Sequence, residues 1–126
     1  MLIGYPARKS DVEYEIPDSV TIICDWAFCG CAQLKKVIIP DSVNEIGEGA
    51  FYKCTDIEKL EIPDSVTKID DVAFRGCTNL KEIIIPVSVK EFGWGIFNGC
   101  ENVTVICDDN SSAAEYCDNK HIKRKK

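Results

Sequence analysis

The stretch Ile39-Pro40-Asp41-Ser42-Val43 decides the fold, because it returns three more times at one spacing. The same motif occupies residues 16–20 and 62–66, and in a fourth copy at 85–89 valine replaces the aspartate. Successive copies are 23 residues apart, without an insertion. A strict period of this length is the signature of a stacked repeat protein, in which each unit contacts mainly its neighbours.

Other positions keep this period and indicate which side chains face the interior. Three apolar ladders recur: Phe28, Phe51, Phe74 and Phe97; Cys31, Cys54, Cys77 and Cys100; Leu34, Ile57, Leu80 and Val103. In Val37-Ile38-Ile39 and its copies the outer residues are apolar while the middle one varies, which predicts a strand whose alternate side chains face inward. The proline that follows ends the strand, because it cannot donate a ladder hydrogen bond.

In the return segment of each unit, an apolar residue occurs every three or four positions, as at Val43, Ile46 and Ala50, and these residues are expected to face the interior. This spacing predicts a helical or 3₁₀ turn. The expected fold class is therefore α/β: a right-handed solenoid of about four 23-residue repeats, with a parallel concave sheet and an irregular or 3₁₀ convex side. A short C-terminal helix, capped by Ser111 or Ser112, is expected to cover the last layer.

We expect one domain over residues 1–126. It divides into a lead-in with the first strand at 1–15, the repeats at 16–107, and a cap with a basic tail at 108–126. The basic tail, 121–126, is expected to be frayed and solvated.

Composition excludes several classes of function. Fifteen basic and 21 acidic residues give a net charge of -6, which repels nucleic acid on average. No apolar run approaches the roughly 20 residues that span a bilayer, so no membrane span is expected. The N-terminus lacks the features of a secretory signal, which leaves two alternatives: a cytoplasmic protein, or an excised piece of an exported one.

The cysteines fall into two groups. Those of the ladder are expected to be buried, inert thiols. Cys24, Cys29, Cys107 and Cys117 fall outside the ladder near the two ends, where we expect exposed free thiols, with a disulfide at one end as the alternative. Their spacing fits no standard zinc motif, and the lone His121 lies in the tail, so neither a metal site nor a cysteine nucleophile is expected.

The aspartates of the motif, Asp18, Asp41 and Asp64, should stack along one edge. Turn capping by Asp and Ser oxygens is the plainer interpretation, and a divalent cation shared along the row is the alternative. No serine triad, phosphate loop or metalloprotease motif occurs, so we expect neither an enzyme nor a cofactor.

The outward strand positions include the candidate partner-binding residues. Glu13 and Glu15 face outward in the first unit, and the candidates in the next three units are Lys36, Ile38, Lys59, Glu61, Glu82 and Ile84. The mixture of charge with the exposed Ile38 and Ile84 fits a protein-protein surface. Lys36, Lys59 and Glu82 equally fit a cross-strand charge ladder that serves only the fold.

The unit Leu34-x-x-Val37-x-Ile39-Pro40-x-Ser42-Val43-x-x-Ile46-Gly47-x-x-Ala50-Phe51-x-x-Cys54 closely resembles the BspA-like, or treponemal-type, leucine-rich repeat. The lead-in from Leu2 to Pro17 and the ending from Val103 to Cys117 also resemble the family's terminal segments. Members are frequently exported or surface-attached bacterial proteins with adhesion roles.

The resemblance implies a protein ligand, with a host extracellular protein as one candidate, and a location at the cell surface or outside the cell as part of a larger exported protein. A structural spacer within such a protein is the alternative function. A cytoplasmic location, the ligand and the oligomeric state stay open.

Overall fold

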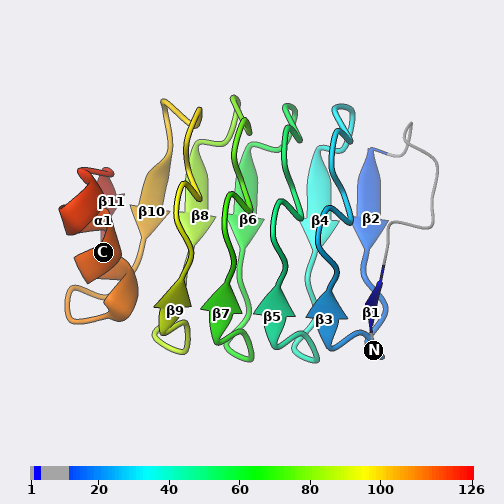
Figure 1. The fold of residues 1–126 in the computed structure, drawn as a ribbon, viewed down its shortest axis with the longest axis horizontal. Coiled ribbons are helices and arrows are strands. Elements are labelled where there is room, and N and C mark those ends of the chain that lie inside the picture. The colour runs from blue at the N-terminus through cyan, green and yellow to red at the C-terminus, as the bar shows by residue number, and fades with distance from the viewer. Residues whose placement is uncertain (1, 4–11) are drawn as a thin grey trace.

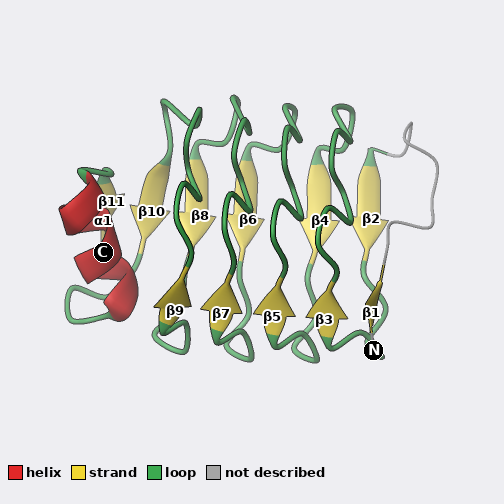
Figure 2. Ribbon diagram, in the orientation of Figure 1, coloured by secondary structure: helices red, strands yellow, loops and turns green. Residues whose placement is uncertain are grey.

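The computed structural model describes residues 2–3 and 12–126. The chain winds into a solenoid whose turns stack along one axis, with β1 and α1 at opposite ends (Figure 1). Its strands are β1 (Leu2–Ile3), β2 (Glu13–Glu15), β3 (Ile22–Ile23), β4 (Lys36–Ile38), β5 (Glu45–Ile46), β6 (Lys59–Glu61), β7 (Lys68–Ile69), β8 (Glu82–Ile84), β9 (Glu91–Phe92), β10 (Thr104–Ile106) and β11 (Arg124–Lys125). The described part has one helix, α1 (Ser112–Lys120) (Figure 2). Nowhere in residues 2–3 and 12–126 is a helix long and apolar enough to cross a membrane.

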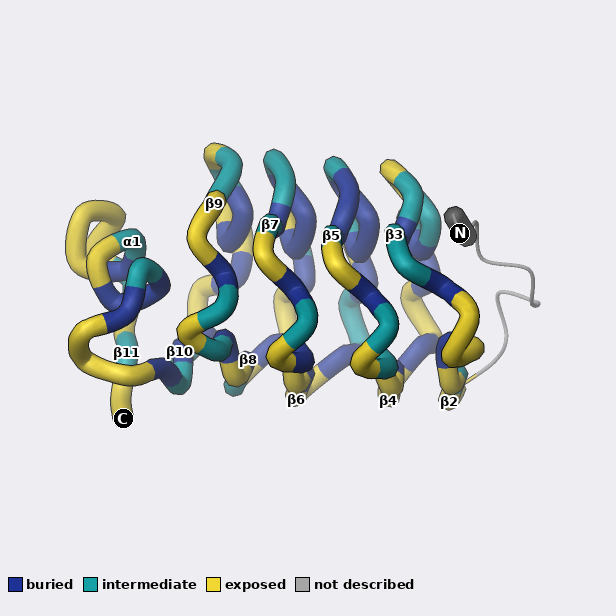
Figure 3. Tube along the Cα trace, turned by 90° about the horizontal axis from the view of Figure 1, so that it is seen from below, coloured by how far each residue is buried: buried dark blue, intermediate teal, exposed yellow. Residues whose placement is uncertain are grey.

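The three-residue strands line one side of the solenoid and are all parallel. In β4 the side chain of Val37 is buried and that of Ile38 is exposed, and β6 repeats the pattern with Leu60 and Glu61. The predicted alternation is confirmed, and Figure 3 shows that buried and exposed stretches recur at matching places in successive turns. The outward side of β2, β4, β6, β8 and β10, with β11 beside β10, is called the strand face below.

The return segments differ from the prediction. In place of helical or 3₁₀ turns, they hold a second parallel sheet of two-residue strands in the order β1-β3-β5-β7-β9, followed by hydrogen-bonded turns. Backbone N–H groups of one turn donate to carbonyls of the next, as in Phe28 to Ala50 at 2.7 Å and Phe51 to Ala73 at 2.8 Å. Because these long-range bonds satisfy the backbone, local helical bonds are not required.

The core is a set of ladders that run along the solenoid axis. The rings of Phe28, Phe51, Phe74 and Phe97 stack with successive centroid distances of 5.0, 5.5 and 5.9 Å. Offset or stacked aromatic pairs at this distance contribute about 0.5–1.5 kcal/mol beyond the burial of their area. Each of these turns therefore depends on its neighbours for the burial of its phenylalanine ring.

The solenoid has about five turns, one more than the four copies of the motif suggest. The five three-residue strands β2, β4, β6, β8 and β10 mark them. The last of these strands, Thr104–Ile106, is not followed by the proline motif, so a count of the motif copies does not include its turn. At the other end, Leu2 and Ile3 pair with Ile22 and Ile23, while the rest of the predicted lead-in at residues 1 and 4–11 lies outside the described residues.

The C-terminal cap begins at Ser111, whose hydroxyl accepts the N–H of Ala114 at 3.1 Å and fills the N-cap position of α1. Ala113, Ala114 and Cys117 are buried against the last turn. Tyr116 stacks on Phe92 with the ring centroids 4.9 Å apart. The helix thus covers the last apolar layer, as expected of the end of a solenoid.

The basic tail is not frayed, contrary to the prediction. Arg124 and Lys125 form β11, which pairs in parallel with β10. The Arg124 guanidinium contacts Asp109 at 2.8 Å and Asp118 at 2.9 Å, and its hydrogen bonds hold the pKa of the Asp118 carboxyl below the usual value. These contacts fix the tail to the cap helix and extend the sheet by one strand.

Candidate functional site

Strand pairing arranges the outward residues of the strand face in two rows. Register places Glu13 opposite Lys36, Lys59 opposite Glu82, and Glu82 opposite Thr104. The second row pairs Glu15 with Ile38, Glu61 with Ile84, and Ile84 with Ile106. All six residues proposed from the sequence therefore lie on one surface: Lys36, Ile38, Lys59, Glu61, Glu82 and Ile84.

A shallow hollow of about 720 Å³ lies over the centre of this face. Its lining includes all six proposed residues, together with buried side chains such as Leu60. Ile38 is 44% exposed and Ile84 is 40% exposed, and they are among the six large hydrophobic residues that the described chain exposes. An apolar floor with charges around it is the usual composition of a recognition surface.

Charges lie unevenly around the hollow. Lys35, Lys36 and Lys59 line it where β4 and β6 begin, whereas Asp41 and Asp64 line it beyond the ends of these strands. Glu58 and Glu82 also line the first of these ends, so an extended ligand along the strands would meet charges of both signs at one end and anions at the other.

The hydrogen-bonded ladder of the strand face stops between β4 and β6. β2 and β4 form one sheet, and β6, β8, β10 and β11 form another. Ile62 N–H donates to the Ile84 carbonyl at 3.0 Å, whereas the equivalent bond from Ile39 to Glu61 is not formed in the described structure. Polar backbone groups of β4 and β6 are thus left without a partner across the gap between these two turns.

The charge ladder proposed from the sequence is partly present. Lys59 and Glu82 form an ion pair at 3.9 Å, and Lys125 of the tail reaches Glu82 at 3.2 Å. Lys36 forms no ion pair with any described residue. Exposed pairs of this kind contribute about 0–1 kcal/mol each, so they add little to the stability of the fold.

Sequence reasoning missed three residues of the strand face. Thr104 and Ile106 extend the two rows because β10 pairs with β8 in register. Lys125 lies opposite Ile106 because β11 pairs in parallel with β10. The alternation of Thr104-Val105-Ile106 was the available signal for the first two, whereas nothing in the basic tail indicates that it pairs.

The cysteine ladder is buried, as predicted, and it also makes bonds between turns. The thiols of Cys54, Cys77 and Cys100 donate to carbonyls of the preceding turn at 3.0–3.1 Å. Burial and the neighbouring Cys31 raise the pKa of Cys54 to about 12. A thiol in this position is protonated at neutral pH and inert as a nucleophile.

The expectation for the other four cysteines is partly wrong. All eight cysteines are free, and Cys24 and Cys29 are half-buried, but Cys107 and Cys117, which lies on the inner side of the cap helix, are buried. Burial, followed by the neighbouring Cys107, raises the pKa of Cys117 to about 12.

Thiol labelling checks this arrangement. Treatment of the native protein with iodoacetamide at pH 8 is expected to modify Cys24 and Cys29, while the other six cysteines react only after unfolding. With a pKa of about 12, roughly one Cys117 thiol in ten thousand is ionised at this pH. Mass spectrometry of the labelled peptides gives the result, and modification of Cys117 as fast as Cys24 would show that the cap does not cover it.

The serines of the motif act differently from the expected turn caps. Ser65 donates to the Val43 carbonyl at 2.5 Å, and Ser88 donates to the Val66 carbonyl at 2.7 Å, so each hydroxyl joins two turns. The buried Ser42 hydroxyl makes no such bond within the described chain. Within the described residues, no three His, Cys, Asp or Glu side chains are grouped to hold a metal ion.

The stacked parallel turns, the ladders and the strand face define a leucine-rich-repeat solenoid. Residues 9–119 match the family described as BspA type leucine rich repeat region, with six copies of the repeat. The chain belongs to this family of repeat proteins. No curated protein matches the chain significantly.

Solved structures of bacterial proteins are similar to the chain. A leucine-rich repeat protein from Eubacterium ventriosum is 34% identical with a TM-score of 0.78, and the match covers 86% of this chain and 29% of that one. A leucine-rich repeat protein from Bacteroides ovatus is 31% identical with a TM-score of 0.76, and the match covers 90% of this chain and 29% of that one. The pneumococcal vaccine antigen PcpA is 30% identical with a TM-score of 0.78, and the match covers 85% of this chain and 27% of that one. A leucine-rich cell surface protein from Faecalibacterium prausnitzii is 26% identical with a TM-score of 0.70, and the match covers 90% of this chain and 36% of that one. The chain spans about a third or less of the length of these proteins.

Proposed function

We propose that this chain recognises another protein through the hollow of the strand face, as an adhesion or binding module of an exported or surface-attached protein. Solenoids of stacked repeats commonly use the strand side as an extended binding surface. The observation that carries the proposal is the hollow of about 720 Å³, in which two exposed isoleucines lie among charged side chains. The similarity to a leucine-rich cell surface protein supports the location.

The hollow suggests how the partner is held. An extended segment laid over β4 and β6 contacts the outward side chains of the strand face, because the backbone N–H and carbonyl groups of these strands point toward the neighbouring turn and not out of the sheet. Ile38 and Ile84 supply apolar contact on either side of Glu61. In this arrangement Lys36, Lys59 and Glu82 set the orientation of the partner more than its affinity.

A binding screen against extracellular matrix and serum proteins tests the proposal, with an Ile38→Asp/Ile84→Asp double variant. Saturable binding to the wild type is expected to weaken at least tenfold in this variant, because two charges would be buried in the interface at a cost of more than about 1.4 kcal/mol. Surface plasmon resonance measures the loss.

Val87→Asp is the matched control. Val87 is 55% exposed and lies outside the hollow, and aspartate is the residue that the first three copies of the motif carry at this position. Binding by this control at the wild-type level, with loss in the double variant, supports the strand face. Absence of binding to every candidate favours the alternative, a structural spacer within a larger protein.

A further inference from the structure

The last return segment of the solenoid has a free hydrogen-bonding edge at the C-terminal end. In the first described pair of turns, three N–H groups two residues apart donate to carbonyls of the next turn at 2.7–2.8 Å: Trp26 to Glu48, Phe28 to Ala50 and Gly30 to Tyr52. The next two pairs of turns repeat the pattern at 2.8–3.1 Å. Gly95, Phe97 and Gly99 hold the equivalent positions in the last turn, and their N–H groups find no acceptor in the described structure.

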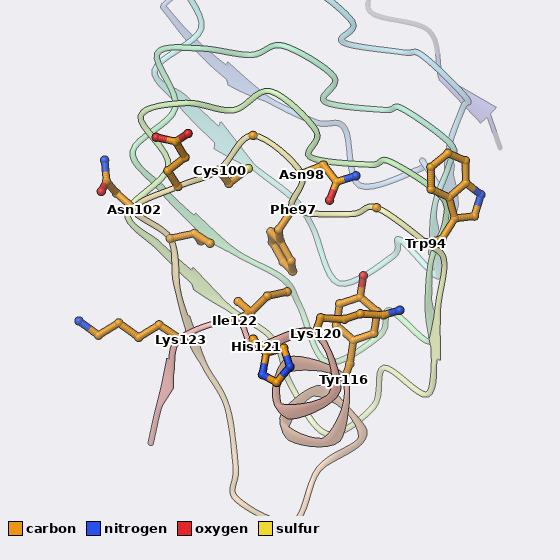
Figure 4. A pocket seen from close by; sticks show the side chains of 14 residues that line it. Trp94, Phe97, Asn98, Cys100, Asn102, Tyr116, Lys120, His121, Ile122 and Lys123 are labelled. Atoms are coloured by element: carbon orange, nitrogen blue, oxygen red, sulfur yellow. The ribbon is translucent and has the colours of Figure 1, made fainter.

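These three residues line a groove of about 860 Å³ between the last return segment and the cap (Figure 4). Ile122 of the cap lies close to Phe97, which is only 6% exposed. The cap therefore covers the apolar core, and its Tyr116 hydroxyl bonds to the backbone of Ile96, but the N–H groups of Gly95, Phe97 and Gly99 stay unpaired in the described structure.

The cap wall of the groove is basic. Lys120, His121 and Lys123 line it, against a single acidic residue, Glu101. Neither Lys120 nor Lys123 forms an ion pair with any part of the chain that the structure describes. In a chain with a net charge of -6, this local excess of cations favours an anionic ligand.

We propose that this groove binds an acidic peptide segment of a second polypeptide, which takes the place of a further return segment. Its carbonyl groups, two residues apart, accept hydrogen bonds from Gly95, Phe97 and Gly99, as the carbonyls of the following turn do elsewhere in the solenoid. Its acidic side chains face Lys120 and Lys123. The peptide is thus recognised by strand addition: hydrogen bonds to the main chain supply the affinity, and the charges select an acidic sequence.

The chain itself provides the design of a probe. A capped octapeptide Glu-Ile-Gly-Glu-Gly-Ala-Ala-Tyr reproduces residues 45–52, whose carbonyls accept the first set of bonds, with alanine at position 51 because Ile122 lies near Phe97. Half-saturation is expected at or below about 1 mM, an ordinary affinity for a short linear peptide. Titration is followed by amide NMR, and hydrogen exchange is measured with and without peptide.

In the free protein, the amides of Gly95 and Gly99 should exchange at least tenfold faster than those of Gly49 and Lys53, which are bonded to the next turn. Saturation with the peptide should slow exchange at Gly95, Phe97 and Gly99. A peptide with lysine in place of both glutamates should bind at least tenfold more weakly.

Charge reversal in the protein gives the matched pair of variants. Lys120→Glu/Lys123→Glu should weaken binding of the acidic peptide about tenfold, since each exposed charge pair accounts for a factor of a few. Lys35→Glu/Lys90→Glu changes the net charge equally and lies outside the groove, so it should bind as the wild type does. The Ile38→Asp/Ile84→Asp variant should also bind the peptide normally, which separates this site from the strand face.

Three results would overturn the proposal: no NMR shift at about 5 mM peptide, equal affinity for the acidic and the lysine peptide, or protection from exchange at residues other than Gly95, Phe97 and Gly99.

Discussion

Phe51→Ala is expected to lower the free energy of unfolding by about 3–5 kcal/mol, the range for removal of a fully buried aromatic ring. Phe51 has no exposed surface and stacks between Phe28 at 5.0 Å and Phe74 at 5.5 Å. The cavity would open in the middle of the ladder, where the turns on both sides are held by the same stack. Urea denaturation followed by circular dichroism measures the change.

Two further substitutions serve as controls for this prediction. Trp94→Ala removes a larger ring that is 61% exposed, and should change stability by about 0.5 kcal/mol or less. The loss of stability in Phe97→Ala should lie between those of Phe51→Ala and Trp94→Ala, because Phe97 stacks on one neighbouring ring of the ladder instead of two. Equal losses for Phe51→Ala and Trp94→Ala would contradict the role of the aromatic ladder in holding the turns together.

The repeat period, together with the alternation along each strand, predicted which side chains face inward. Val37, Leu60 and Ile83 are buried at matching positions, because identical units in register must bury identical residues. The same argument placed Ile38 and Ile84 outward. Period-two alternation is a local property of the strand, so it can be found in the sequence before any contact between turns is known.

The conformation of the return segment could not be predicted in this way. A spacing of three or four between Val43, Ile46 and Ala50 is typical of a helix, yet Glu45–Ile46 forms a strand of a second sheet. Bonds between residues more than 20 positions apart, such as Phe51 to Ala73, override the local preference. Local periodicity contains no information about these bonds.

The candidate site shows a similar division. The outward residues followed from register, but the interruption between β4 and β6 did not, since the two units have nearly the same strand pattern. Burial of Cys107 and Cys117 depends on how the cap helix packs, which has no counterpart in the repeats. Side-chain orientation in the repeated strands could therefore be predicted from the sequence, whereas backbone bonds between turns and the packing of the cap could not.

Gly93→Ala is expected to destabilise the protein by about 3 kcal/mol, at the upper end of the range for overpacking. A methyl group at this position would lie 2.3 Å from both Asp71 N and Asp71 Oδ1. Gly93 donates to the Ile69 carbonyl at 2.8 Å, and the Asp71 carboxylate accepts the N–H of Trp94 at 3.0 Å, so neither segment can move without loss of a bond. Thermal and urea unfolding measure the effect.

Gly30→Ala separates this steric cause from the conformational preference of glycine. Gly30 has a φ of +73° and nothing within 4 Å of an added methyl group, so alanine there should cost only the strain of the left-handed conformation, about 1–2 kcal/mol. Gly47 lies against Asp25 as Gly93 lies against Asp71, with a methyl group 2.7 Å from the Asp25 nitrogen. Gly47→Ala should therefore resemble Gly93→Ala more than Gly30→Ala. If all three variants lose the same stability, close packing between turns is not what requires glycine at positions 47 and 93.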